Sequence, residues 1–302
     1  MIILSEDSDR LPPSASRQEN HTVTEAAKLL GAKVYYIPDD FSLCGTAENA
    51  LWHIPKQAEE TLGIWIGYIP TLSRYEAIYA AALNKNIRLL NNPTEHLLVQ
   101  ECDRACERLQ ELTPETFILT HQNQCQSAIE KVGLPAFVKG AVQSRKKHGW
   151  KACVAENLDE LEQLTVQLLS LEGRTRGRVL VRKLVKLRYS RTSGEGFPLG
   201  REYRVFLYRQ KVLGYGYYWD GDDPLKILSE PEKQQVLNLA KEAARRVNVP
   251  YIAIDIGQSK NGRWLVIETG DPQFSGVSQI PLLPLWNQIL QIDRELKCLN
   301  LN

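Results

Sequence analysis

The dipeptide Asn261-Gly262 stands between two runs in which apolar and polar residues alternate, "IDIGQSK" and "RWLVIETG". Such a dipeptide between alternating runs is the strongest short-range signal for a β-hairpin, and it favours a two-residue turn of type I′. The sequence therefore predicts an antiparallel pair of strands at this place. The last two-thirds of the chain as a whole are predicted to be α+β with mainly antiparallel strands.

Counting back from this turn sets the register of the hairpin. With Asn261 and Gly262 as the turn, Asp255 lies directly opposite Glu268. Because side chains alternate between the two faces of a strand, the other face of the pair is the predicted core face. Its members are Ile254, Ile256, Leu265 and Ile267.

Two opposed acids on one face of a hairpin need an explanation. Directly opposed side chains have Cβ atoms about 4.5–5.5 Å apart, and like charges there are destabilising. A Mg²⁺ ion held by Asp255 and Glu268 would remove the repulsion, because Mg²⁺ takes one or two carboxylates together with substrate phosphates. Asp271 is a candidate third ligand. The alternative is a solvated pair with ion pairs to nearby Lys or Arg.

The first hundred residues alternate between strand-like and helix-like segments, which predicts a small parallel sheet with helices on its faces. The predicted strands are 1–4, 33–38, 63–70 and 87–90, and the predicted helices are 22–32 and 73–86. This region lacks the glycine pattern GxGxxG, so it does not indicate a dinucleotide site.

Asn91-Asn92-Pro93 interrupts both periodicities and marks a boundary. A helix over 94–112 follows it, and a polar loop is predicted at 191–200 between the later strands. We expect three parts: an N-terminal βαβ lobe at 1–93, a small α+β subdomain at 94–181 and a large α+β subdomain at 182–302 that carries the hairpin.

Composition limits the class of protein. The N-terminal "MIILSEDSD" lacks the basic start and apolar stretch of a signal peptide. No apolar run approaches the roughly 18 residues of a membrane helix. Six cysteines without a CxxC pair favour reduced thiols over a disulfide framework or a zinc site. We therefore expect a cytoplasmic protein with no membrane partner.

Positive charge is concentrated in two segments, although the net charge of the chain is only +1. Between Arg174 and Lys211 there are twelve Lys and Arg residues against two acids. The segment 139–151 holds five Lys and Arg residues and no acid. Both segments predict local positive fields in a nearly neutral protein, and these fields need an explanation.

Several of these cations stand at places suited to phosphate. Lys139 ends the apolar run "PAFVKG" and is placed to hold phosphate oxygens, although a surface lysine is the commoner reading of any single Lys. Period-2 alternation puts Glu202 and Arg204 on one strand face, where Arg204 is either half of an ion pair or a cation for a transferring phosphoryl group. Arg182 is expected to point into solvent.

The order of these parts resembles the ATP-grasp superfamily, whose members clamp Mg-ATP between two α+β subdomains. The chain is most similar to a branch with an E-[WY]-R-V-F strand, here "EYRVF" (202–206), and an E-x-G-D-x-Q-x-x-G ending, here "ETGDPQFSG" (268–276). The resemblance spans nearly the whole chain. It implies an ATP-grasp fold preceded by the N-terminal βαβ lobe.

The resemblance also implies roles for single residues. Lys139 and Arg104 would contact ATP phosphates, Lys183 and Val185 would line the adenine pocket, and Glu202 would contact the ribose. Arg204 would be the cation for the phosphate or acyl phosphate, and Asp255 and Glu268 would hold Mg²⁺ or, alternatively, Mn²⁺.

This sequence departs from the family pattern at three places. The acid often found just before the hinge lysine is Arg182 here. Many members carry Asn two residues after the metal-binding Glu, where this chain has Gly270, so Asp271 is the substitute to test. The loop after Lys139, "AVQSRKKHGW", has only Gly149, so it would meet phosphate through charge rather than through a backbone nest.

The implied activity is an ATP- and Mg²⁺-dependent ligase that joins a carboxylate to an amine through an acyl phosphate and forms ADP. Its substrates would be small-molecule or peptide carboxylates and amines. One alternative is an ATP-dependent phosphotransferase. Another is a non-catalytic module for nucleotides or nucleic acid that uses the 174–211 segment, and the paired acids count against it.

Overall fold

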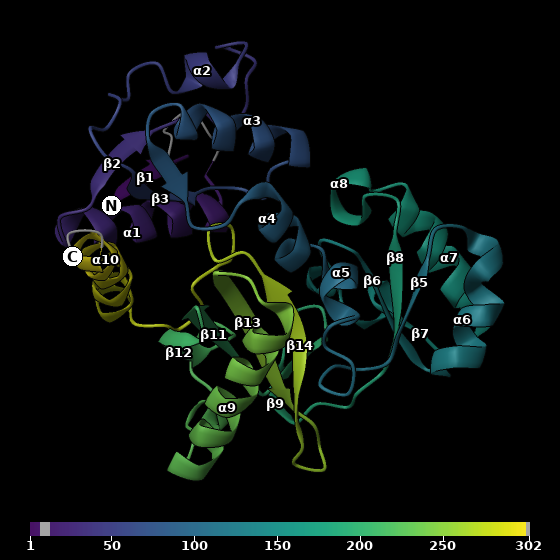
Figure 1. Cartoon of the computed structure of the whole chain (residues 1–302). Coiled ribbons are helices and arrows are strands. Elements are labelled where there is room, and N and C mark those ends of the chain that lie inside the picture. Colours follow the sequence, from purple (N-terminus) through teal and green to yellow (C-terminus); the bar gives the residue numbers. More distant parts are fainter. Residues whose placement is uncertain (7–12, 300–302) are drawn as a thin grey trace.

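This computed structural model describes residues 1–6 and 13–299 (Figure 1). Of the acids predicted to follow the first apolar run, Asp7 and Asp9 lie outside the described residues, as does the side chain of Cys298. The other five cysteines are free thiols. Within the described residues, no helix is both long and apolar enough to cross a membrane.

The N-terminal part is a parallel sheet with helices on both faces. Its strands run in the order β2 (Lys33–Tyr36), β1 (Ile2–Ser5), β3 (Thr61–Ile66) and β4 (Ile87–Leu89), all parallel. The helices are α1 (Ala15–Leu29), α2 (Ala47–Ala50) and α3 (Leu72–Leu83). Helix α1 begins earlier than predicted because Ser14 caps it, its hydroxyl accepting from the Arg17 amide at 3.1 Å.

The predicted helix over 94–112 is wrong, because two short helices replace it. Helix α4 (Pro93–Gln100) opens with a capping box between Asn92 and Glu95, and α5 (Cys102–Cys106) follows. Glu101 between them is extended, with ψ of 106°. The Cys102 amide donates to the Ala141 carbonyl instead of continuing the helix, which ties α5 to the segment that follows Lys139.

A second sheet, antiparallel throughout, carries Lys139. Its strands run in the order β5 (Thr116–Leu119), β8 (Val179–Lys183), β6 (Ala136–Gly140) and β7 (Val154–Ala155). Helices α6 (Cys125–Val132) and α7 (Leu158–Leu169) share one apolar core with it, and α8 (Glu172–Thr175) follows α7. The predicted boundary at 181/182 falls inside β8.

A third sheet carries the hairpin. Its order is β12 (Lys211–Tyr217), β11 (Glu202–Tyr208), β13 (Tyr251–Gln258) and β14 (Trp264–Gly270), all antiparallel. Helix α9 (Glu230–Val247) packs on one face. The predicted loop at 191–200 is wrong in part, because β9 (Tyr189–Thr192) and β10 (Pro198–Gly200) pair across it.

The hairpin turn differs from the predicted two-residue turn. The Gly262 amide donates to the Ser259 carbonyl and the Ser259 amide donates to Arg263, so three residues form the loop, with Gly262 left-handed at φ 89°. A β-bulge between Asp255 and Ile256 then shifts the register back. Asp255 therefore does lie opposite Glu268, as predicted, through two offsetting departures.

The bulge also changes which face carries the apolar side chains of β14. Ile256 pairs with Val266, and both are buried in the core under α9. Leu265 and Ile267, which we expected on the core face, do not belong to this core. Ile267 is the extra residue of the bulge, and its side chain lines a cavity beside Glu268.

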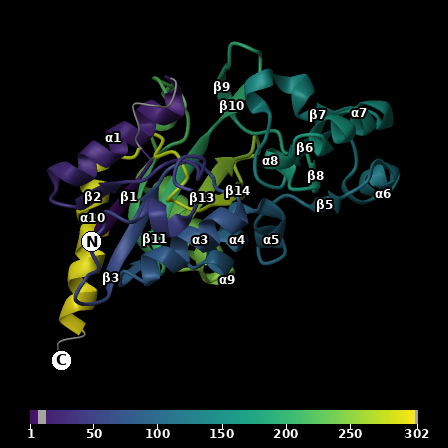
Figure 2. The ribbon, with the colours of Figure 1, turned by 90° about the horizontal axis from the view of Figure 1, so that it is seen from above.

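Helix α10 (Leu282–Leu299) returns from the third sheet to the N-terminal part, where it lies beside α1 (Figures 1 and 2). One core cluster joins Ile64 of β3, Ala27 of α1, Phe206 of β11 and Trp286 of α10. The Met1 ammonium also binds the Asp293 carboxylate at 2.7 Å. The third sheet therefore packs directly on the N-terminal part, while the three-part division stays a prediction.

Candidate active site

Three charged residues form a row across the third sheet. Arg204 on β11 pairs in register with Asp255 on β13, and Asp255 pairs with Glu268 on β14. Glu202 lies two residues from Arg204 and therefore on the same strand face, as predicted. The strand period and the register bring four of the predicted site residues to one surface.

The Arg204 guanidinium binds the Asp255 carboxylate through two hydrogen bonds. Its Nε and Nη2 donate to the two carboxylate oxygens, each at 2.8 Å, and Nη1 donates to the Gly276 carbonyl at 2.6 Å. The guanidinium also lies 4.8 Å from the centre of the Tyr218 ring. Burial opposes its charge, but Asp255 raises the pKa of Arg204 further above its usual range.

Lys139 reaches the row from the second sheet. It is the last residue but one of β6 and is almost fully buried, and its ammonium forms an ion pair with Glu268. Burial opposes the charge on both groups, yet their mutual attraction raises the pKa of Lys139 and lowers that of Glu268. A Cβ on Gly140 would lie 2.2 Å from the Arg174 carbonyl oxygen, so only glycine fits after this lysine.

Lys146, from the basic loop after β6, completes the site and was not singled out from the sequence. Its ammonium lies 3.7 Å from Glu202 and close to the rings of Tyr218 and Trp219, at 5.8 and 5.4 Å from their centres. Burial opposes its charge, but Glu202 raises the pKa of Lys146. Nothing in "SRKKHG" distinguishes it from its basic neighbours.

The first cavity at this row has a volume of about 440 Å³ and lies between the second and third sheets. Lys139, Lys146, Glu202 and Glu268 stand at its charged end. Its apolar lining includes Phe137, Trp150, Leu184, Val185, Leu187 and Ile267. The predicted Lys183 also lines it, so every predicted ATP contact except Arg104 and Arg204 borders this cavity.

A second cavity of about 450 Å³ meets the first. Ser144, Lys146 and Glu268 line both cavities and form their common wall. Arg204 lines only the second cavity, which extends to Ser16 and Ile69 of the N-terminal part. A larger hollow of about 1010 Å³ borders Lys183 and Val185 but none of the charged row, so we do not place the chemistry there.

Arg182 is a positioning residue. The prediction that its side chain points into solvent is wrong. Arg182 is buried, and it donates to the Ile267 carbonyl at 2.7 Å and to the Thr113 hydroxyl at 2.6 Å. The Thr113 hydroxyl in turn donates to the Val266 carbonyl at 2.9 Å. These bonds hold the two backbone carbonyls at the bulge and so set the position of Glu268.

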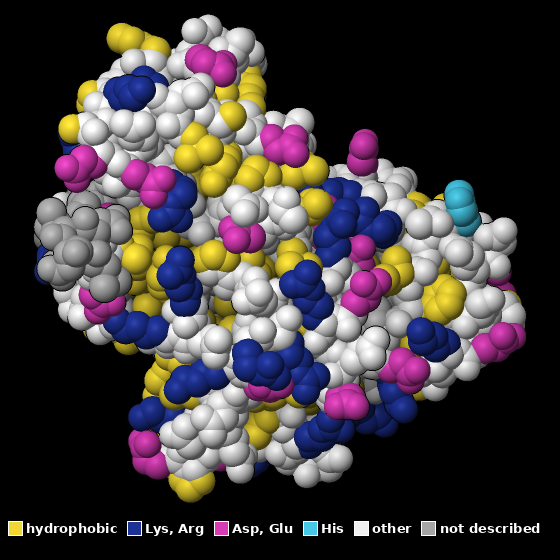
Figure 3. Space-filling model, in the orientation of Figure 1, with side chains coloured by type: hydrophobic (Ala, Val, Ile, Leu, Met, Phe, Trp, Pro, Cys, Tyr) yellow, Lys and Arg dark blue, Asp and Glu magenta, His cyan; other side chains and the backbone are white. Residues whose placement is uncertain are grey.

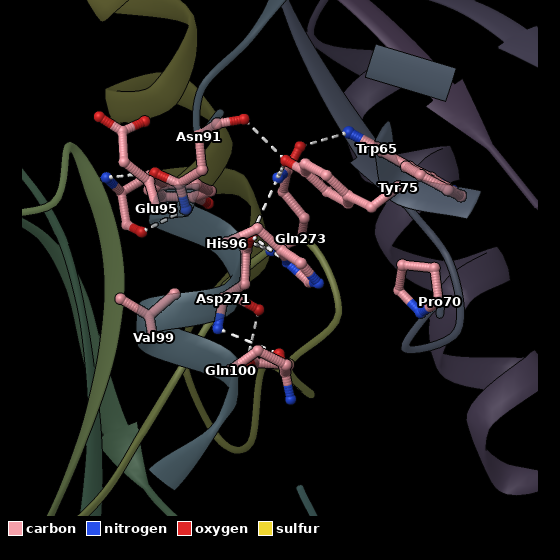
Figure 4. A network of polar contacts seen from close by, with 12 residues as sticks. Trp65, Pro70, Tyr75, Asn91, Glu95, His96, Val99, Gln100, Asp271 and Gln273 are labelled. Atoms are coloured by element: carbon pink, nitrogen blue, oxygen red, sulfur yellow. Dashed lines mark hydrogen bonds and ion pairs between the residues drawn. The ribbon is translucent and has the colours of Figure 1, made fainter. Parts of the chain in front are cut away.

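Asp271 does not join the acidic pair. It is fully buried, and its carboxylate binds His96 Nδ1 at 2.9 Å and Gln273 Nε2 at 3.2 Å (Figure 4). No group of three or more His, Cys, Asp or Glu residues among the described residues could hold a metal ion. The prediction of Asp271 as a third metal ligand finds no support in this geometry, because its carboxylate lies with His96 and Gln273 and not beside Glu268.

The remaining donors do suit Mg²⁺ shared with a phosphate ligand. Asp255 and Glu268 supply two hard carboxylates near the common wall, and one oxygen of buried Glu202, Oε2, has no hydrogen-bond partner among the described residues. Two carboxylates fit an ion that takes its other ligands from phosphates and water, but they do not fit an all-protein cage.

Arg104 lies outside the candidate site. Its side chain, on α5, is about half exposed and binds the Glu101 carboxylate at 2.6 Å. It lines neither of the two cavities. Glu101 also binds Arg176 and Arg178, so Arg104 belongs to a cluster that joins α5 to the end of α8. The prediction that Arg104 contacts ATP phosphates finds no support in this geometry.

The fold is shared with solved ATP-grasp structures. A RimK domain protein from Sphaerobacter thermophilus aligns with TM-score 0.61 at 16% identity, over 97% of this chain and 98% of that one. D-alanine–D-alanine ligase from Bacillus anthracis, in complex with ATP, aligns with TM-score 0.66 at 12% identity, over 98% and 96%. The ATP-grasp ligase PsnB with a minimal precursor gives 0.57 at 13%, over 96% and 98%.

No curated protein matches the sequence significantly. The model of an ATP-grasp domain family, family 3 of the R-two-K clade, matches residues 130–289, which is more than half of the chain. This range contains the charged row, Lys139, Lys146 and most of the lining of both cavities. The chain therefore belongs to the ATP-grasp family, in the R-two-K clade.

Proposed function

We propose that this protein is an ATP-dependent ligase that joins a carboxylate to an amine, with an acyl phosphate as intermediate and ADP as product. One observation carries the proposal: Lys139 binds Glu268 where a mainly apolar cavity meets a polar one, and Glu268 is paired across the sheet with Asp255, which holds Arg204. Such a junction is where a nucleotide phosphate and a second substrate would meet. D-Alanine–D-alanine ligase and PsnB, which share the fold, are ligases by name.

The first cavity suits ATP. Its volume of about 440 Å³ and its lining by Phe137, Leu184 and Val185 fit a flat apolar base. Glu202, at the charged end, can accept from a ribose hydroxyl, and Lys139 and Lys146 can bind the phosphates. Lys183 stands at the end of β8 beside the base site.

Asp255 and Glu268 would hold Mg²⁺, or Mn²⁺ in its place. When bound, this ion supplies positive charge that offsets the charge on the phosphates. In this structure Lys139 and Arg204 neutralise the two carboxylates. Once a metal ion binds the carboxylates, the two cations would be positioned to bind anionic oxygens of the substrates.

In the proposed reaction, an oxygen of the substrate carboxylate attacks the γ-phosphorus and the bond to the ADP oxygen breaks. The amine nitrogen then attacks the acyl carbon, phosphate leaves, and the amine loses a proton to solvent. The chain contributes orientation and charge: Lys139 and Lys146 bind phosphate oxygens, and Arg204 steadies the acyl phosphate. This role fits a site without an activated nucleophile.

The test is ATP consumption by the full chain with Mg²⁺ and pools of carboxylates and amines, with product masses. We expect ADP and a ligated product, and a loss of about a hundredfold or more in rate for Glu268→Gln. Glu48→Gln, at an exposed position of α2, is the matched control. AMP instead of ADP contradicts the acyl-phosphate route, and a stable phosphorylated product indicates a phosphotransferase.

A further inference from the structure

The two positively charged segments, 139–151 and 174–211, differ in how far acidic side chains neutralise them in the folded chain. In the 174–211 segment several cations are neutralised by acids from elsewhere. The ion pairs of this segment's cations among the described residues are Arg176–Glu101, Arg178–Glu101, Arg178–Asp103, Arg191–Asp223, Arg201–Glu232, Arg204–Asp255 and Lys211–Glu295. Figure 3 shows Lys and Arg side chains interspersed with Asp and Glu on one face of the molecule.

The 139–151 segment is not neutralised in this way. Lys139 and Lys146 face Glu268 and Glu202, but Arg145 and Lys147 have no carboxylate within ion-pair distance among the described residues. Arg145 donates to the neutral Gln167 side chain at 3.1 Å. Arg174, opposite this loop, donates to the Ser144 carbonyl at 3.0 Å and likewise has no acid partner in the described chain.

These three cations face the second cavity and not the first. Arg145, Lys147 and Arg174 line the 450 Å³ cavity, whereas none of them lines the nucleotide cavity. Among the described residues, the only carboxylate in the wall of the second cavity is Glu268, which already holds Lys139. The second cavity therefore carries positive charge from these three residues, in addition to the charge of the lysines proposed to bind the nucleotide phosphates.

We propose that the second cavity binds a substrate that carries several carboxylates, either an acidic peptide segment or a small polycarboxylate. This inference rests on the proposed ligase function, which requires one carboxylate at the junction with the nucleotide. The additional carboxylates bind Arg145, Lys147 and Arg174. Guanidinium groups suit this task because their planar donors match carboxylates with two parallel hydrogen bonds.

The size of the cavity agrees with this occupant. A volume of about 450 Å³ holds a small molecule or the end of a peptide, but not a nucleic-acid duplex. Tyr218 and Trp219 in its wall offer apolar surface to the methylene groups of acidic side chains. Unlike charges also raise the association rate of an acidic substrate with this cleft, an effect that falls with ionic strength.

Direct binding tests the inference without turnover. The probes are a short oligoglutamate peptide, its oligoglutamine counterpart, citrate and acetate. Each is titrated by calorimetry into the full chain, with and without Mg²⁺ and a non-hydrolysable ATP analogue. We expect oligoglutamate or citrate to bind at least about tenfold more tightly than its neutral or monocarboxylate counterpart when the analogue is present. If oligoglutamate binds more tightly, the substrate is an acidic peptide segment, and if citrate binds more tightly, it is a small polycarboxylate.

The variant Arg145→Gln/Lys147→Gln should lose this preference while its affinity for the analogue stays unchanged. Lys241→Gln, an exposed cation on α9, is the control and should keep the preference. Equal affinities for acidic and neutral probes, or binding of none of them, overturn the inference. Failure of the analogue to bind instead contradicts the proposed ATP-dependent function, so the two failures are distinguishable.

Discussion

At the residue scale, the site is an array of buried charges, each held by an opposite charge. Arg204 is paired with Asp255, Lys139 with Glu268, and Lys146 lies near Glu202. In a cleft of low dielectric, removal of one partner leaves an uncompensated buried charge, which costs about 3–5 kcal/mol. Substitutions in this array therefore affect stability as well as activity, and the two must be measured together.

The buried Glu6 carboxyl should make stability depend on pH. Burial raises the pKa of Glu6 to about 7, despite the attraction of Arg74 at 2.6 Å. The folded state therefore keeps this proton to higher pH than the unfolded chain, in which a glutamate has a pKa of about 4.3. The free energy of unfolding should fall, by roughly 3 kcal/mol in all, as the pH rises through this window and reaches about 7.

Chemical denaturation of the parent and Glu6→Gln at several pH values tests this expectation. Glutamine keeps an acceptor for the Tyr68 amide, which donates to Glu6 at 2.7 Å, but it does not titrate. The variant should lose the fall in stability between the two pKa values, whereas the control Glu48→Gln, at an exposed position, should retain it. Parallel profiles for the parent and Glu6→Gln would exclude Glu6 as the source.

Cys106 should be the more reactive thiol of α5. The Cys102 thiol, with its sulfur 3.8 Å away, acts as a hydrogen-bond donor that lowers the pKa of Cys106 to about 6. Iodoacetamide at neutral pH should label Cys106 before the buried Cys102, whose pKa is raised by its hydrogen bond to Cys106 and by burial. Peptide mass mapping over a pH series gives the rates.

Two variants separate the hydrogen bond from the packing in this pair. Cys102→Ser keeps a donor and should preserve the inflection of the labelling rate near pH 6. Cys102→Ala removes the donor and should move the inflection of Cys106 to higher pH. A Cys106 rate that is insensitive to both changes contradicts the role of Cys102.

At the element scale, the β13–β14 hairpin is the part of the fold on which the acids depend. Its three-residue loop alone would place Glu268 one residue out of register with Asp255, and the bulge restores the pairing. The segment 112–116 and β8 stabilise this bulge, through the bonds of Thr113 and Arg182 to its carbonyl groups. The position of the acidic pair is therefore set by elements outside the hairpin.

Replacement of Arg182 tests this dependence. Arg182→Met leaves the Ile267 carbonyl without its donor, so we expect a loss of roughly 3 kcal/mol in the free energy of unfolding. We also expect a lower kcat, because Glu268 loses its fixed position. Lys183→Met, an exposed cation one residue along β8, should leave the free energy of unfolding unchanged. Unchanged stability of Arg182→Met would show that the bulge holds itself.

At the scale of the whole molecule, a buried polar network joins the N-terminal part to the segment after β14. The Gln273 side chain accepts from the Trp65 amide at 2.9 Å and donates to the Tyr75 hydroxyl at 2.9 Å (Figure 4). The His96 ring stacks on Tyr75 at 4.0 Å and binds Asp271. The segment "GDPQ" at the end of β14 therefore serves the junction with the N-terminal part.

Asp271→Asn separates this structural role from metal binding. His96 and the Gln273 side chain bind one oxygen of Asp271, and the Gln273 backbone amide donates to the other oxygen at 3.1 Å. We expect the variant to be less stable by about 1–3 kcal/mol, because its amide NH₂ group cannot accept at one of these two positions. The Mg²⁺ dependence of ATP consumption should keep its midpoint, since Asp271 is not among the acids of the site. A large rise in the Mg²⁺ requirement would return Asp271 to the metal ligands.

Several features of the site could be predicted from local sequence alone. Strand alternation placed Glu202 and Arg204 on one face, and the apolar run before Lys139 predicted the strand that carries this lysine. The environment of Arg182 could not be predicted in this way. Its carbonyl and hydroxyl partners, Ile267 and Thr113, stand 85 and 69 residues away in the chain, so no local pattern reveals them.

By itself, the sequence determined the parallel N-terminal sheet, the antiparallel strands and membership of the ATP-grasp fold, because these depend on local periodicity and short motifs. Only the tertiary structure decided that Asp271 belongs to the junction with the N-terminal part, that Arg182 holds the bulge, and that Arg145, Lys147 and Arg174 lack acid partners among the described residues. The physical reason is that hydrogen bonds and charge compensation are made between segments distant in the chain, and burial decides their strength.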